Sequence, residues 1–229
     1  YLKNGFTSVQ TAKQDGIFRG TSFVASLGSG RTNDLVYQSN GLQFLSFDKG
    51  SSKQAYPSSL MGSIALIRQT LSDANWYQQA AGKNDTRYFD GKIEFNAALE
   101  SLANVEKQGV LFDAGDQQSL FRADKLMADF SVPVVHLGSG KEYARIDQIK
   151  STKDRIILPV NFPKAPKLTG VNDELDVTLA TLRHWERAPG NAAELEANNV
   201  SFAFSQYGLK KTKDFWPNLR KAIKHGSSE

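Results

Sequence analysis

The sequence predicts an α/β fold with a mainly parallel sheet, organised as part of a (β/α)8 barrel. Apolar runs typical of strands alternate with amphipathic segments typical of helices from Phe6 to the C-terminus, which is the pattern of βαβ units. The strand candidates are apolar on both faces, as strands between two layers of helices or in a closed barrel must be. No GxGxxG or GxxxxGK[ST] motif follows a strand, so the open doubly wound sheet of a dinucleotide-binding or P-loop protein has no support.

The first part of the chain predicts three strands and one long helix. The strand candidates, rich in β-branched and aromatic residues, are residues 6–12, 23–27 and 42–47. Gly- and Asp-rich stretches between them indicate loops. Pro57 fits the first turn of a helix over residues 57–82. Apolar residues recur in it at helical spacing: Leu60, Ile64, Ile67, Leu71 and Ala74.

The second part alternates more regularly. The strand candidates are residues 110–115, 132–138, 155–162 and 200–206. The helix candidates are residues 93–109, 116–130, 141–150, 171–188, 191–199 and 214–226. The seven strands need one more to close a barrel. The N-terminal YLKNG looks like the end of a helix closed by a Gly C-cap, so we expect the first strand to be missing. Residues 1–229 are therefore predicted to be a single barrel segment, truncated at both ends.

Composition excludes several kinds of site and partner. The chain has no cysteine, which excludes disulfides and thiolate metal sites. Its longest apolar runs are about five residues, far short of the ~20 that cross a bilayer, so no membrane partner is expected. The net charge of +4 comes from a C-terminal excess of lysines over residues 209–225. No interleaving of aromatic and basic residues accompanies it, so this stretch predicts a solvated helix face and no nucleic-acid partner.

In a parallel α/β barrel the functional side chains lie at the C-terminal ends of the strands. The pocket candidates at these ends are Asp113, His136, Asn161, Gln206 and Tyr207. None of them can be assigned a catalytic role from the sequence. Asp116 is expected to cap the helix that follows it, and not to act as an acid or base.

The three histidines share no metal-ligand spacing. His136 is the best single candidate, and a zinc site would need to combine it with Asp113 and remote carboxylates. No GxSxG motif is present and the serines of residues 50–63 have no histidine near them in the sequence, so no nucleophilic triad is predicted.

Five longer stretches are distinctive: residues 5–22, 50–77, 157–166, 182–189 and 214–223. Together they resemble the amidohydrolase superfamily, specifically imidazolonepropionase-like members found as long multidomain bacterial proteins. The resemblance implies a barrel of the metal-dependent-hydrolase type. An intact member of that type has a His-X-His on its first strand, further histidines on the fifth and sixth strands, and an aspartate on the eighth.

The resemblance also implies that this active site is degenerate. The first strand is absent, Asp113 stands where the histidine of the fifth strand is expected, and His136 keeps the position on the sixth. Tyr207 stands where the eighth strand would carry its aspartate. A phenol with a pKa of about 10 cannot replace a carboxylate as a base at neutral pH, so loss of hydrolysis is expected.

Two functions follow as expectations from the resemblance. The first is an amidohydrolase-like domain that is non-catalytic or auxiliary within a larger hydrolase acting on non-peptide C–N bonds. It needs no cofactor in this segment, and its partners are the remaining domains of the parent polypeptide. The alternative is an active metal-dependent hydrolase of C–N bonds in cyclic amides, with a divalent ion such as zinc. The resemblance implies a bacterial protein and leaves both a periplasmic and a cytoplasmic location open.

An incomplete barrel also bears on assembly. Without its first strand, a barrel leaves two sheet edges and an apolar lumen open, and open edges invite pairing with another chain. We therefore expect the segment to form homo-oligomers.

Overall fold

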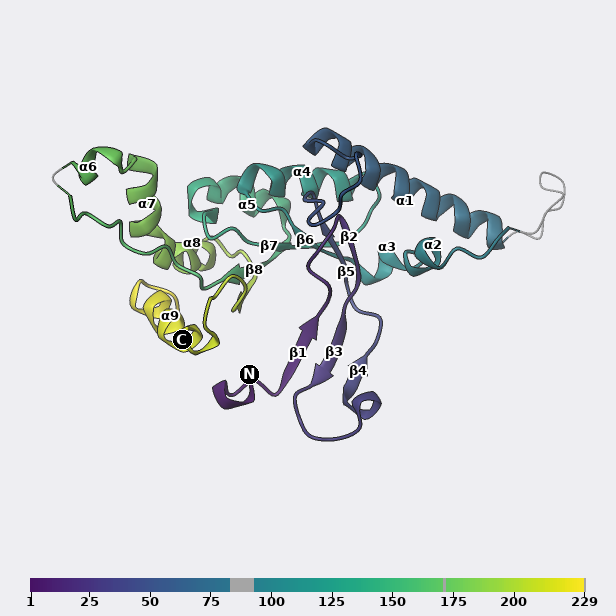
Figure 1. Cartoon of the computed structure of the whole chain (residues 1–229), viewed down its shortest axis with the longest axis horizontal. Helices are drawn as coiled ribbons and strands as arrows, with labels where there is room; N and C mark the ends of the chain where they lie inside the picture. Colours follow the sequence, from purple (N-terminus) through teal and green to yellow (C-terminus); the bar gives the residue numbers. More distant parts are fainter. Residues whose placement is uncertain (83–92, 171, 229) are drawn as a thin grey trace.

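The computed structural model describes residues 1–82, 93–170 and 172–228. Its centre is a six-stranded sheet in the order β2-β5-β6-β7-β8-β9, in which β5 to β9 are parallel and β2 is antiparallel to β5 (Figure 1). The strands are β2 (Phe18–Thr21), β5 (Gln43–Ser46), β6 (Val110–Asp113), β7 (Val134–Leu137), β8 (Arg155–Pro159) and β9 (Phe202–Ser205). The predicted α/β fold with a parallel sheet is confirmed.

Three helices lie along one face of this sheet: α1 (Leu60–Gly82), α4 (Gln117–Ala128) and α5 (Ile146–Thr152) (Figure 1). The core forms between them, because the register aligns Leu45, Phe112 and Ile156 in one row across the strands. Their partners on the helices are apolar and fully buried, as Ile67 and Leu126 show. Side chains one residue away in each strand point to the opposite face, since the side-chain period of a strand is two.

Two of the predicted strands do not belong to the parallel sheet. β1 (Ser8–Thr11), β3 (Phe23–Ser26) and β4 (Val36–Gln38) form a separate antiparallel sheet in the order β1-β3-β4, which extends away from the six-stranded sheet (Figure 1). None of their residues is buried. The prediction of seven barrel strands is therefore wrong for residues 6–12 and 23–27, where the strand segments exist but neither face is covered by helices.

Several predicted helices are broken into shorter pieces. Residues 93–109 contain α2 (Ala97–Ser101) and α3 (Val105–Gln108), separated by a turn, and Asn96 caps α2 by accepting bonds from the backbone of Ala98 and Leu99. Residue 171, at the start of another predicted helix, lies outside the described residues. The rest of the predicted helix over residues 171–188 is divided into two helices. The division occurs because the backbone of Thr178 is extended and its side chain caps the second helix, which begins at Leu179. The remaining elements are α6 (Asp173–Asp176), α7 (Leu179–Arg187), α8 (Asn191–Ala197) and α9 (Phe215–Lys224).

The N-terminal segment packs against α9. A single 3₁₀ turn over Leu2–Asn4 is closed by Gly5 with φ 85°, which confirms the predicted Gly C-cap. Trp216 donates its indole N–H to the carbonyl of Asn4 at 2.7 Å, and the ring of Phe6 lies 5.1 Å from that of Phe215. The two ends of the described chain are therefore close together in space. No helix in the described ranges is long and apolar enough to span a membrane.

Candidate functional site

A polar cluster around Asp113 occupies the sheet face opposite the helices α1, α4 and α5. Asp113 is the last residue of β6, and one oxygen of its carboxylate, Oδ2, accepts two bonds. Arg19 on β2 donates from Nη1 at 2.9 Å, and Tyr207 beyond β9 donates its hydroxyl at 3.1 Å. The Arg19 side chain is only 7% exposed and that of Asp113 is 16% exposed, so the ion pair is largely shielded from water.

This cluster links both edges of the sheet to β6. β2 and β9 are the outermost strands. Two strands, β7 and β8, lie between β6 and β9. In a flat sheet with a spacing of about 4.8 Å, β6 and β9 would lie about 14 Å apart. The long side chains of Arg19 and Tyr207 therefore reach from both edges of the sheet to the same carboxylate, on the face that would line the lumen of a barrel.

The phenol of Tyr207 is held in its neutral form. Burial raises the pKa of Tyr207 above its usual value of 10.0, and the negative charge of Asp113 raises it further. The phenol consequently acts at this position as a hydrogen-bond donor to Asp113. Because Asp113 accepts from two donors through Oδ2, that oxygen is engaged within the protein.

Two other strand-end candidates, Gln206 and Asn161, lie near Tyr207. Gln206 precedes Tyr207 in the sequence, and Asn161 lies next to Gly208 in space. Gln206 begins the turn in which Leu209 N–H bonds to the carbonyl of Gln206 at 3.0 Å. Asn161, which follows β8 and is exposed, lies against Gly208: a Cβ at Gly208 would stand 2.8 Å from the Asn161 amide nitrogen. Gly208 also has φ 74°, in the left-handed region that favours glycine. No hydrogen bond joins Asn161 or Gln206 side chains to Asp113 in the described chain.

His136 is not part of this cluster. The register aligns His136 with Phe112 and Ile156, which face the helices, whereas Asp113 aligns with Leu137 on the other face. The His136 side chain is fully buried, and Nε2 lies 2.9 Å from Oδ2 of Asp154. The prediction that His136 lines the barrel mouth with Asp113 is therefore wrong, because its position along β7 directs the ring to the helix side.

His136 belongs to a second polar cluster, on the helix side of the sheet. Asp124 of α4, His136 of β7 and Asp154, just before β8, offer ligand atoms that all lie within 4.8 Å of one another. Burial raises the pKa of Asp124 to about 6, and the hydrogen bond and negative charge of Asp154 raise it in the same direction. The cluster thus gathers two carboxylates and one imidazole between three elements of the core.

Sequence reasoning missed Arg19, Asp124 and Asp154. Asp124 had a detectable signal, because it is four residues after Leu120 and three before Met127, on the helix face that packs on the sheet. Asp154 stands two residues before the buried Ile156 and so shares its face. Arg19 lies in a short strand next to Phe18, and nothing in the local sequence distinguishes it from a surface arginine.

All three histidines of the sequence are placed, and none contacts the Asp113 cluster. Nδ1 of His184, on α7, lies 3.3 Å from the hydroxyl of Tyr143. The imidazole ring of His184 stacks on the phenol ring of Tyr143. Burial lowers the pKa of His184, with Lys141 adding to the effect. His225 follows α9 and is exposed. With no cysteine in the chain, the lumen cluster has one carboxylate and no imidazole as metal-binding groups.

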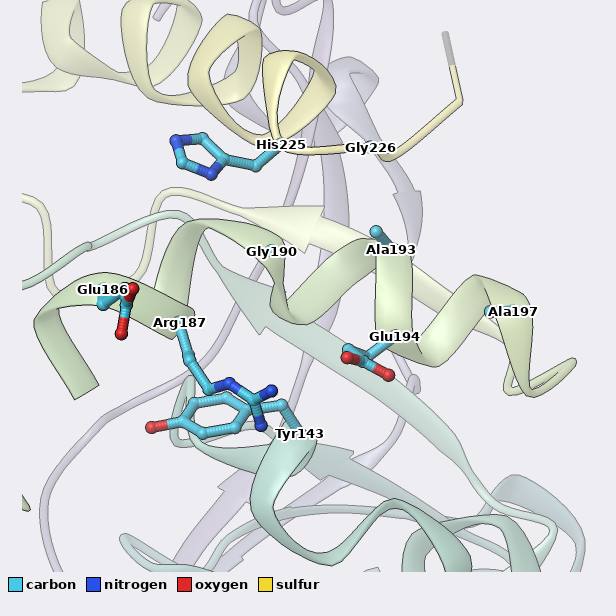
Figure 2. Close-up of a pocket in the computed structure, with 9 residues that line it drawn as sticks. All are labelled: Tyr143, Glu186, Arg187, Gly190, Ala193, Glu194, Ala197, His225 and Gly226. Atoms are coloured by element: carbon cyan, nitrogen blue, oxygen red, sulfur yellow. The ribbon is translucent and has the colours of Figure 1, made fainter. Parts of the chain in front are cut away.

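An open cleft of about 430 Å³ lies elsewhere, among α7, α8 and the end of α9 (Figure 2). Small residues of α8 form part of its wall, including Ala193 and Ala197. Glu186 and Glu194 line it together with Arg187, so its charges are of both signs and do not select a ligand of one charge. None of the predicted pocket candidates lines this cleft.

Comparison with known proteins identifies the architecture. No protein-family model matches the chain, and no curated protein matches its sequence. The structure is similar to the crystal structure of an amidohydrolase from Thermotoga maritima, with a TM-score of 0.74 at 16% sequence identity over 98% of this chain. The chain has the fold of part of an amidohydrolase. It spans 57% of the length of the matched protein, and at this identity the likeness concerns the fold.

The amidohydrolase-like fold raises the question of a metal at the C-terminal ends of the strands, and the residues there do not fit one. A catalytic zinc site needs three protein ligands drawn from imidazole, thiolate and carboxylate groups. The lumen cluster supplies only Asp113, and Arg19 places a positive charge against the carboxylate oxygen Oδ2. A cation at that oxygen would have to displace the guanidinium.

Proposed function

We propose that this chain is a non-catalytic, auxiliary amidohydrolase-like domain of a larger hydrolase that acts on non-peptide C–N bonds. The observation that carries the proposal is the ion pair between Arg19 and Asp113, with Tyr207 bonded to the same oxygen. The fold supports the amidohydrolase part of the proposal through the likeness to the Thermotoga maritima protein. The substrate class comes from the sequence resemblance to imidazolonepropionase-like proteins.

The cluster supports a structural role more than a hydrolytic one. Activating water at a metal requires an ion held by several donors, with a coordination position left for the water. Here the carboxylate at the end of β6 is neutralised by a shielded guanidinium, and the position beyond β9 carries a phenol whose pKa is raised. Such a group donates a hydrogen bond at neutral pH and accepts no proton from water. The same contacts join β2, β6 and the segment after β9, so they serve to hold these strands together.

Hydrolysis assays with added metal test the proposal. The purified chain is incubated with Zn²⁺, Mn²⁺ or Fe²⁺ and with five- and six-membered cyclic amides, and ring opening is followed by the loss of ultraviolet absorbance. We expect no metal-dependent turnover above that of the Asp113→Asn variant. Metal-dependent ring opening by the wild-type chain that is lost in Asp113→Asn would overturn the proposal and establish an active hydrolase.

A second measurement addresses the ion pair directly. Removing the guanidinium in Arg19→Met leaves the Asp113 carboxylate free to bind an ion, if other ligands are within reach. We expect that this variant binds no additional equivalent of Zn²⁺ in equilibrium dialysis relative to the wild-type chain. An additional equivalent that requires Asp113 would show that a lumen site exists beneath the ion pair, contrary to the proposal.

A further inference from the structure

The second polar cluster, on the helix side of the sheet, has no part in the proposed function. Its three residues come from separate elements, which are α4, β7 and the residue before β8, and they converge on one point. His136 is fully buried, whereas Asp124 and Asp154 are partly exposed, so the cluster is open to solvent on its carboxylate side. It faces away from the lumen, where the register places Asp113.

The charges of this cluster are not balanced by the protein. Two carboxylates stand against one imidazole, and no lysine or arginine of the described chain forms an ion pair with either carboxylate. The ligand oxygens of Asp124 and Asp154 lie within 4.8 Å of each other, so two negative charges stand close together. A cation placed between these oxygens would neutralise both carboxylates.

From this geometry we propose that Asp124, His136 and Asp154 form a binding site for one divalent transition-metal ion of the Zn²⁺ class. One imidazole nitrogen and two carboxylate oxygens are a donor set that zinc accepts, and solvent can supply the fourth ligand. Ligand atoms around a tetrahedral zinc lie about 3.4 Å apart, given bonds of about 2.0–2.1 Å. Since the three ligand atoms already lie within 4.8 Å of one another, side-chain rotations of the two aspartates suffice to close the site.

The second nitrogen of His136 limits the expected affinity. Nδ1 is buried and has no hydrogen-bond partner in the described chain. When Nε2 binds a metal, Nδ1 carries the ring proton, and metal-binding histidines normally donate this proton to a carboxylate or carbonyl. Lack of that acceptor lowers metal affinity by about 10- to 100-fold. We therefore expect this site to bind zinc with lower affinity than typical structural zinc sites do. The bound ion would link α4 to β7 and β8.

Metal binding by the tag-free chain tests the site. The protein is stripped with chelator, and Zn²⁺ binding is measured by equilibrium dialysis and Co²⁺ binding by the visible absorption of the four-coordinate ion. We expect one ion per wild-type chain and a rise in melting temperature on binding. Asp124→Asn and Asp154→Asn are expected to weaken binding by about tenfold or more, since even outer-shell partners cost 10- to 100-fold.

Matched controls separate this site from others in the chain. Asp129→Asn changes an exposed carboxylate just beyond the same helix, and His225→Gln changes an exposed histidine, so both should bind as the wild-type chain does. Circular dichroism verifies folding, and the two aspartate variants decide the matter even if a His136→Gln variant fails to fold. Absence of Co²⁺ and Zn²⁺ binding by the wild-type chain, or unchanged binding by Asp124→Asn, would overturn the inference. Because Asp113→Asn should leave this ion bound, a metal that depends on Asp113 would instead contradict the proposed function.

Discussion

At the scale of single residues, Asp113 is the common partner of the side chains that link both edges of the sheet to β6. Its carboxylate is largely shielded from solvent and accepts from Arg19 and from Tyr207. A buried carboxylate whose cationic partner is removed keeps its desolvation penalty but loses the compensating charge, which makes loss of one partner more costly than loss of both. Removal of Arg19 is therefore the change in this cluster that should lower the free energy of unfolding most.

Removing that partner in Arg19→Met should lower the free energy of unfolding by about 3 kcal/mol, at the low end of values for buried pairs because Asp113 stays partly exposed. The Arg19→Met/Asp113→Asn double variant should recover part of this loss, since it leaves no unpaired charge. Urea unfolding of the wild-type chain, the two single variants and the double variant measures the coupling. Strict additivity of the two single effects would show that the ion pair does not operate as described.

The raised pKa of Tyr207 predicts a loss of stability at alkaline pH. Burial and the nearby Asp113 raise the pKa of the folded state above 10.0. Above about pH 10 the unfolded chain releases this proton while the folded chain keeps it, so the unfolded state gains and stability falls with rising pH. Tyr207→Phe should remove this part of the slope, whereas Tyr37→Phe, at an exposed ring, should not. Urea midpoints measured from about pH 9 to about pH 11 compare the three chains.

At the scale of elements, α4 begins where the sequence predicted. Asp116 accepts from the backbone N–H of Ser119 at 3.0 Å and from its hydroxyl at 2.8 Å, which confirms Asp116 as the N-cap. Asp116→Ala should cost about 1 kcal/mol, the usual value for a lost N-cap. Gln118→Ala, at an exposed position of the same helical turn, is the matched control and should change the unfolding free energy by less than about 0.5 kcal/mol. Equal effects of the two substitutions would contradict the capping role.

The same elements show what the sequence could and could not predict. Capping residues and apolar periodicity are local, so the starts of α4 and the strands from β5 to β9 were predictable. The pairing of β1 with β3 was not, because strand propensity does not specify a partner. A shift of one residue moves a side chain to the other face of a sheet. For this reason His136 was wrongly grouped with Asp113, whereas Tyr207, in the turn after its strand, donates its hydroxyl to Asp113.

At the scale of the whole molecule, the six-stranded sheet has two unpaired edges in the part of the chain that the structure describes. β2 and β9 are its outermost strands, and the described residues provide no further strand that pairs with β9. Ala203 of β9 shares a face with Ile157 and is exposed, so the lumen is accessible to solvent along this edge. Exposed strand edges pair readily with other chains unless a charge or a cover prevents it.

We therefore expect the isolated chain to self-associate through the edge formed by β9. Light scattering after size exclusion should give a mass above the 25.3 kDa of one chain, increasing with protein concentration. Ala203→Lys places a charge on the open edge and should shift the population toward the monomer. Ala98→Lys introduces the same charge at an exposed position of α2, away from the sheet, and should leave association unchanged. A wild-type chain that stays at the monomer mass at all concentrations, without binding a dye for exposed apolar surface, would show that the edge is protected within the chain itself.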